Sequence, residues 1–110
     1  MSETYENTMK VALCASRHPI PDVELSIFPQ VVENPLDFDA HDKLVESWIE
    51  TMYYFLHDEN NKLYVYVTGL TPVLVSFLHT YNTRVFPAGA SVSLMHYNRE
   101  TNEYVEQEWY

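Results

Sequence analysis

Five consecutive residues, Thr68-Gly69-Leu70-Thr71-Pro72, have the types and order of a loop that could hold an anion. Thr71 is a good N-cap and proline suits the first helical position, so a helix is predicted to begin here. The free N–H groups and positive dipole end of a helix start attract phosphate. Gly69 allows close approach to the backbone, and Thr68 and Thr71 add hydroxyl donors. We take residues 68–71, Leu70 included, as candidate ligand contacts; the alternative is an ordinary strand-to-helix turn.

A second segment, Ser16-Arg17-His18, follows the first apolar stretch of the chain. Arginine offers a planar fork that matches phosphate oxygens, and histidine titrates near neutral pH, where it can act as an acid or a base. Pro19 and Pro21 stiffen the loop, which favours a positioned site. We take Arg17 and His18 as candidate catalytic residues and Ser16 as a candidate ligand contact. The alternative is a surface loop with two unrelated polar side chains.

His96 and Arg99 complete the set of candidate ligand-binding residues. His96 lies in an apolar stretch, where a histidine is more often a core or interface residue than a ligand, and Arg99 lies in a run typical of a tight turn. The five histidines show no zinc-ligand spacing, and the chain contains no Ser-His-Asp signature, Walker-type phosphate loop or GxGxxG run. We therefore expect neither a metal site nor a cofactor.

The elements that would position these residues can be read from hydrophobic periodicity and from the prolines. We predict strands at residues 10–15, near Val31 and Val32, and at 63–67; helices at 40–57 and 72–81; and a β-hairpin of residues 91–97 and 103–109 around a turn at 98–102. Asp39 is the predicted cap of the first helix, and Asp42 is expected in its first turn. The β-branched Val73 and Val75 leave an alternative in which residues 63–78 form a strand hairpin.

Strands that alternate with helices and then end in a hairpin indicate an α/β fold: a single Rossmann-like domain with a mainly parallel sheet and a C-terminal β-hairpin. The strand at 63–67 should be central in a three-layer arrangement, because it is apolar on both faces. Ligands bind such sheets beyond the carboxyl ends of the strands, where both candidate loops lie. The length of 110 residues suits one domain, residues 1–110, with residues 1–8 expected to be flexible.

Charge is the strongest feature of the composition, because six Lys and Arg face sixteen Asp and Glu, for a formal net charge of −10. A long nucleic acid backbone demands many cationic contacts, so such a chain is a poor partner for it and a fair one for a basic protein surface. A small anionic ligand is not excluded, because salt screens exposed charges over about 8 Å.

The single cysteine, Cys14, cannot form an internal disulfide, which favours a reducing, cytoplasmic setting. Apolar stretches fall short of the roughly 18 residues needed to span a bilayer. The first residues are polar and acidic, so neither a membrane span nor a signal peptide is expected.

The strand followed by "TGLTP" and a buried helix resembles the Thr-Gly-x-Thr signature of CRISPR-associated Rossmann-fold (CARF) domains. "SRHP" after a first strand is similar to the "RHP" opening of small stand-alone CRISPR-associated proteins of the ring-nuclease group. Together these motifs cover the central and N-terminal parts of the chain. The resemblance implies a homodimer that binds a cyclic oligoadenylate across its two-fold axis in antiviral signalling. It also implies that some relatives cut the ring without metal, the ribose 2′-hydroxyl attacking the neighbouring phosphate.

Carried over to this chain, the resemblance assigns contacts with phosphate or base to three loop residues: Thr68, Gly69 and Thr71. It places Arg17 and His18 near the reacting phosphate. Leu70 stands where CARF domains usually have a second glycine, and Pro72 where a lysine is common. The expected anion site therefore lacks that cation, which affects both affinity and catalysis.

Two classes of function remain open from the sequence. The first is a cyclic oligonucleotide-binding protein, either a metal-independent phosphodiesterase or a non-hydrolysing sensor or sponge. It requires Arg17 and the loop at 68–71 to converge. The second is an acidic interaction protein that inhibits a nucleic-acid-binding defence enzyme, which requires a contiguous carboxylate face. Three aromatic residues near the C-terminus are a candidate exposed patch for a partner: Tyr97, Tyr104 and Trp109.

Overall fold

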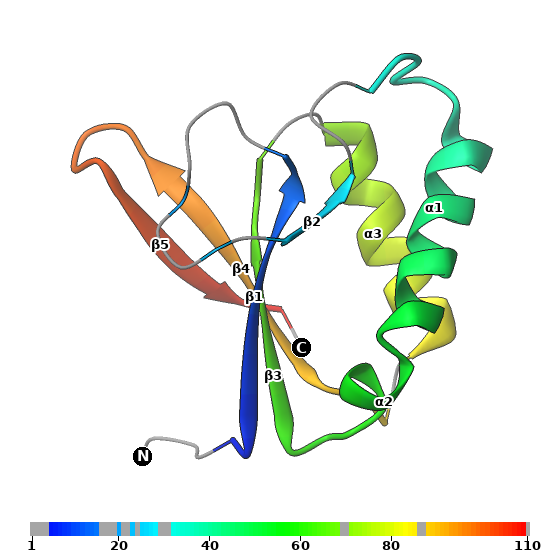
Figure 1. Ribbon diagram of the computed structural model, residues 1–110. Helices are drawn as coiled ribbons and strands as arrows, with labels where there is room; N and C mark the ends of the chain where they lie inside the picture. The colour runs from blue at the N-terminus through cyan, green and yellow to red at the C-terminus, as the bar shows by residue number, and fades with distance from the viewer. Residues whose placement is uncertain are drawn as a thin grey trace.

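The apolar runs form a five-stranded sheet in the order β2-β1-β3-β4-β5, seen in the computed structural model of Figure 1. Its strands are β1 (Asn7–Cys14), β2 (Leu25–Phe28), β3 (Asn61–Tyr66), β4 (Ser91–Asn98) and β5 (Glu103–Glu108). The helices are α1 (Phe38–Thr51), α2 (Tyr53–Leu56) and α3 (Thr71–Arg84). The structure describes residues 5–15, 20, 23, 25–28, 32–68, 71–85 and 88–109.

Four parallel strands and one antiparallel strand make up the sheet, which confirms the predicted α/β fold with a mainly parallel sheet and a C-terminal hairpin. β3 is the middle strand, as its apolar character on both faces predicted. Leu63 and Val65 are fully buried under the helices, and Tyr66 is buried on the other face. β1 begins at Asn7, so residues 7 and 8 belong to a strand and not to the flexible segment that we expected.

Both long helices pack on one face of the sheet and against each other (Figure 1), so the expected three-layer arrangement is wrong. The chain passes from β2 to β3 and from β3 to β4 in the same direction across the sheet. Right-handed connections therefore put α1 and α3 on the same side. The β1–β2 connection runs the other way, and its Ile20 and Val23 pack with Ala12 and Tyr66 on the opposite face.

The first helix begins two residues earlier than predicted and uses a different cap. The Asp37 carboxylate accepts a hydrogen bond from the Ala40 N–H at 3.2 Å, so Asp37 is the N-cap and Asp39 lies in the first turn. Asp42 lies beyond that turn. The predicted single helix is interrupted at Met52, where α1 ends and the short α2 begins.

Residues 71–84 are helical, which excludes the alternative strand hairpin over residues 63–78. Val73, Phe77 and Tyr81 recur every four residues and are fully buried, and this apolar stripe outweighs the weak helix propensity of β-branched side chains. β2 occupies Leu25–Phe28, so the short strand predicted near Val31 and Val32 was placed too late; Val31 lies outside the described residues.

The C-terminal hairpin has the predicted strands and turn, with Asn102 at φ 58°, a left-handed conformation that asparagine tolerates. Its three aromatic residues do not form one patch. Tyr97 and Tyr104 are cross-strand partners and pack edge to face, with ring centroids 5.3 Å apart. Trp109 lies on the other face, packed against Phe77 and Tyr81. Trp109 therefore belongs to the core side of the sheet.

Candidate site at the carboxyl edge of the sheet

The direction of winding reverses between β1 and β3. The chain leaves β1 toward β2 on one side and returns through α1 to β3 on the other side. In open α/β sheets ligands bind in the crevice beyond the carboxyl ends of the strands at such a point. Both predicted loops follow these two strands. The ends of β1 and β3 thus lie at the same edge of the sheet, the upper one in Figure 1, with Thr68 and the start of α3 beside them.

Thr68 joins the ends of the two strands. Its hydroxyl oxygen accepts a hydrogen bond from the Cys14 N–H at 2.9 Å, and the hydroxyl donates one to the Cys14 carbonyl at 2.6 Å. The Cys14 side chain is buried beside it. The single hydrogen of the Thr68 hydroxyl is committed to this carbonyl, so Thr68 positions the loop instead of donating to a ligand.

Thr71 is the first residue of α3. We predicted it to be the N-cap that precedes the helix, so it lies one position further into the helix than expected. Its side chain is exposed, and its hydroxyl has no hydrogen-bond partner within the described part of the chain. Of the two described residues of this predicted loop, Thr71 is the one with an exposed side chain. The remaining loop residues that we predicted lie outside the described residues: Ser16, Arg17, His18, Gly69 and Leu70.

His96 and Arg99 follow the same edge one strand further along. His96 lies in β4, two residues beyond the buried Leu94 on the helix-covered face, and its Nε2 is 2.7 Å from Oε1 of Gln107 on β5. Arg99 lies in the turn that joins β4 to β5. Because β4 is parallel to β3, its carboxyl end lies at the edge where α3 begins. His96 thus shares a face and an edge with Thr71.

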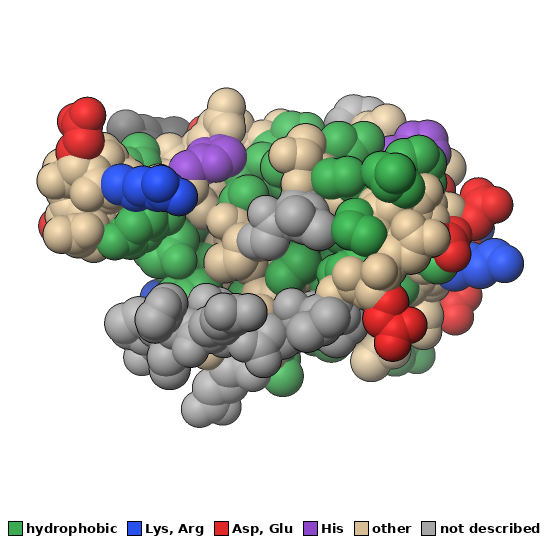
Figure 2. All heavy atoms as spheres, turned by 90° about the horizontal axis from the view of Figure 1, so that it is seen from above, with side chains coloured by type: hydrophobic (Ala, Val, Ile, Leu, Met, Phe, Trp, Pro, Cys, Tyr) green, Lys and Arg blue, Asp and Glu red, His purple; other side chains and the backbone are tan. Residues whose placement is uncertain are grey.

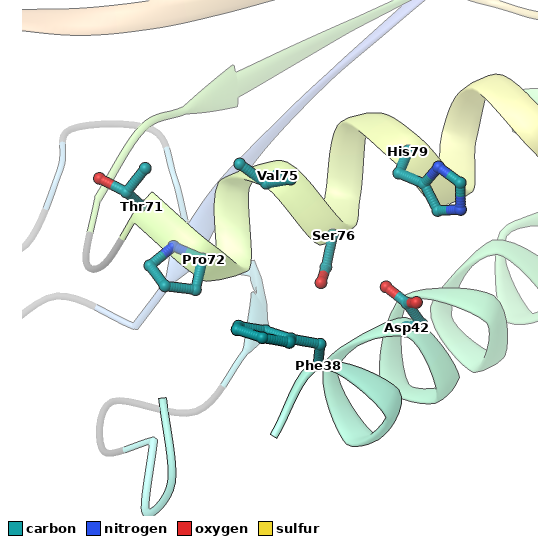
Figure 3. Close-up of a pocket in the computed structure, with 7 residues that line it drawn as sticks. All are labelled: Phe38, Asp42, Thr71, Pro72, Val75, Ser76 and His79. Carbon is teal, nitrogen blue, oxygen red and sulfur yellow. The ribbon is translucent and has the colours of Figure 1, made fainter. Parts of the chain in front are cut away.

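Two hollows near this edge gave no signal in the sequence. One, of about 490 Å³, lies beyond β2 and includes the buried His41, whose Nε2 is 2.9 Å from the Pro35 carbonyl oxygen. The other, of about 420 Å³, lies between the starts of α1 and α3. Figure 3 shows its walls, with the Phe38 ring below Pro72 and the Asp42 carboxylate and Ser76 hydroxyl pointing into the gap. Each joins residues from separate elements, so only the tertiary structure reveals it.

The carboxylates of the described residues lie away from the middle of this edge (Figure 2). Seen from above in Figure 2, the Asp and Glu side chains that are drawn lie at the two ends of the molecule, over the helices and over the hairpin. The centre of the described surface is apolar and uncharged, with one histidine beside it.

Two tyrosines on the helix-free face have altered ionisation. Burial raises the pKa of Tyr64, and the nearby Glu106 adds to the effect. Burial also raises the pKa of Tyr104, with a contribution from Tyr97. Both rings therefore stay neutral at physiological pH. Among the described residues, no three His, Cys, Asp or Glu side chains are grouped so that they could hold a metal ion.

Comparison with protein-family models, with curated proteins and with solved structures gave no match to this chain. In the described part of the chain, every helix is too short or too polar to cross a membrane. The fold and the geometry of the carboxyl edge therefore carry the functional argument.

Proposed function

We propose that this protein binds a small nucleotide ligand, a cyclic oligoadenylate, at the carboxyl edge of the sheet between β1 and β3. The observation that carries the proposal is the pair of hydrogen bonds from Thr68 to Cys14, which fastens the start of one predicted loop to the start of the other. Arg17 follows Cys14 by three residues, and Thr71 follows Thr68 by three. A nucleotide site requires Arg17 and the loop at 68–71 to lie close together. The hydrogen-bonded ends of β1 and β3 support that arrangement.

The start of α3 would receive a phosphate in this proposal. Its N–H groups and its dipole favour an anion, and the exposed Thr71 hydroxyl adds a donor. Arg17 supplies the cation that Pro72, in place of a lysine, does not. His96 lies on the same face at the end of β4 and is a candidate contact to the base or ribose.

The same proposal assigns cleavage, where it occurs, to a mechanism without metal. The ribose 2′-hydroxyl attacks the adjacent phosphorus, the bond to the 5′-oxygen breaks, and a 2′,3′-cyclic phosphate forms. His18 would exchange protons with the attacking or the leaving oxygen, and Arg17 would stabilise the charge on the phosphate. A protein that binds without cleaving would act as a sensor or sponge.

The direct test is to incubate the purified protein with a panel of cyclic oligonucleotides and to follow both binding and products. We expect tight binding of a cyclic oligoadenylate, weakened by Arg17→Ala and by Thr71→Ala. His18→Ala should spare binding and slow any cleavage. A parent protein that binds no member of the panel would refute the proposal.

A cyclic oligoadenylate with an even number of nucleotides is two-fold symmetric, so the proposed complex is a homodimer. The aromatic residues give less support to a dimer than the sequence suggested, because Trp109 is packed into the core side of the sheet. Light scattering at micromolar concentration, with and without the cyclic nucleotide, tests the assembly. A monomer under both conditions would contradict it.

A further inference from the structure

A trough runs along the outer seam between α1 and α3, on the side away from the sheet. Three adjoining hollows form it, with volumes of about 420, 260 and 180 Å³. The first and second share Asp42 and His79, and the second and third share Glu46 and Arg84. Together they form one continuous depression along the two helices, which we call the α1–α3 trough. Its upper end is the cavity of Figure 3.

The two walls of the trough differ in charge. On α1, Asp42, Glu46 and Glu50 all line it, at four-residue intervals, so they form a row with a rise of about 6 Å from one carboxylate to the next. On α3, Pro72 and the 57% exposed Val75 form an apolar patch at the upper end of the trough, and the wall below it is polar, with Thr80, Thr83 and Arg84. The trough therefore pairs a carboxylate row with a wall that is apolar only near its upper end.

The ends of the trough are apolar and aromatic. Phe38 is 55% exposed at the upper end, where it faces Pro72 in Figure 3. At the lower end, Tyr53 is 52% exposed and its ring stacks on His57 with centroids 4.1 Å apart. An exposed ring beside a carboxylate such as Glu50 is a favourable site for a guanidinium or ammonium group.

The carboxylate row already holds one cation. Arg84 crosses from α3 and its Nη2 lies 2.8 Å from Oε1 of Glu46, and the two side chains are 54% and 38% exposed. Exposed pairs of this kind contribute little to stability, so a competing guanidinium can replace Arg84. The pair shows that the row accepts a cation that approaches from the α3 side.

We propose that the α1–α3 trough docks a basic amphipathic helix of a partner protein. A helix that lies along the seam presents Lys or Arg every four residues, which matches the spacing of the carboxylate row. Its apolar side chains contact Phe38 and Val75, as in other helix-in-groove complexes. The net charge of −10 would also attract such a partner from a distance. This proposal does not depend on nucleotide binding at the sheet edge.

The test uses a display library of random helical peptides about five turns long (roughly 18 residues at 3.6 per turn), selected against the full-length protein. We expect the enriched peptides to be cationic and amphipathic, and the affinity of a synthesised one to fall as salt is raised. Glu50→Lys and Val75→Glu should each weaken it by about tenfold, the effect of a buried interface contact. Enriched peptides that are anionic or uncharged, or no enrichment, would overturn the proposal.

Matched controls lie on the hairpin. Glu103→Lys makes the same charge change at an exposed site, and Val105→Glu changes a valine that is 52% exposed. Both should bind the peptide as well as the parent, and all four variants should melt near the parent because the sites are on the surface. Equal losses for trough and hairpin variants would mean that only net charge is recognised, and the proposal would fail. A parent dimer that Val75→Glu dissociates would assign the trough to a second copy and also overturn it.

Discussion

The hydroxyl group of Thr68 lies 2.9 Å from the backbone nitrogen of Cys14 and 2.6 Å from its carbonyl oxygen, and it bonds to both. The backbone pairing of β1 with β3 ends where Ala12 lies opposite Tyr66. The bonds between the Thr68 side chain and Cys14 join the two strands again two residues further along each of them. The two residues are 54 positions apart in the chain. One threonine thus joins the ends of the two strands that precede the loops of the proposed site.

Replacing Thr68 by valine should destabilise the protein and impair ligand binding together. Valine keeps the shape but removes both hydrogen bonds, which leaves two part-buried backbone groups without this partner. The free energy of unfolding should fall by about 1–3 kcal/mol, measured by urea denaturation. Thr68→Ser keeps the hydroxyl and should retain most of the stability. If the Thr68→Val protein is as stable as the Thr68→Ser protein, the two hydrogen bonds do not hold the strand ends together.

Thr71→Ala and Asp37→Ala should separate ligand binding from helix capping. Asp37 caps α1, so its removal should lower the free energy of unfolding by about 1 kcal/mol. Thr71 is an exposed residue inside α3, so its removal should change stability by less than about 0.5 kcal/mol. Only Thr71→Ala should weaken binding of the cyclic oligonucleotide. Calorimetric melting and a binding titration on the same samples measure the two effects separately. A large loss of stability for Thr71→Ala would show that Thr71 caps α3 after all.

Gly89→Ala should be destabilising although the residue lies outside the helices and strands, because Gly89 is buried. A Cβ atom at this position would lie 2.7 Å from the Leu56 carbonyl oxygen and would overlap Cγ1 of Val85. The Leu56 carbonyl also accepts the Ala90 N–H at 2.8 Å, so it cannot move freely. We expect a loss of about 1–3 kcal/mol, as for other overpacked sites, seen in thermal denaturation. The control Ala88→Ser changes an exposed neighbour and should have the melting temperature of the parent. If Gly89→Ala also melts at the parent's temperature, the loop adjusts to the added Cβ at little cost.

Stability should decline in alkaline solution because of Tyr64 and Tyr104. Both pKa values are raised in the folded protein above the ordinary 10.0, so the folded state holds these protons more tightly than the unfolded chain does. Their contribution is complete below pH 10 and is lost as the pH rises through and beyond that value. The double variant Tyr64→Phe, Tyr104→Phe should show a shallower decline in denaturant midpoint above pH 10. An unchanged slope would mean that other groups cause the decline.

Much of the fold was predictable from local patterns. The apolar run at residues 63–67 identified a central strand, because only a strand buried on both faces is apolar at successive positions. The turn around Asn102 was marked by residues that favour turns, and Thr71 followed by Pro72 marked the start of the helix predicted over residues 72–81. These signals are local, since each depends on neighbours within a few residues.

The errors arose where distant parts of the chain decide the outcome. β2 is a four-residue edge strand that is fixed by parallel pairing with β1, and such a short run carries little signal of its own. The one-sided helix layer follows from the order of the strands, which hydrophobic periodicity does not contain. Asp37 and Asp39 are equally good caps by residue type, and only the position of the first helical turn selects Asp37.

The candidate site divides in the same way. The sequence alone identified Thr68 and Thr71 in a predicted strand-to-helix loop and His96 in an apolar strand as candidate ligand contacts, because their types suit caps, turns and ligands. Tertiary structure decided what each does: Thr68 is bonded to Cys14, Thr71 is left exposed, and His96 is paired with Gln107. A hydroxyl or an imidazole can serve the fold or a ligand, and which of the two it serves depends on the groups that the topology brings within hydrogen-bonding distance.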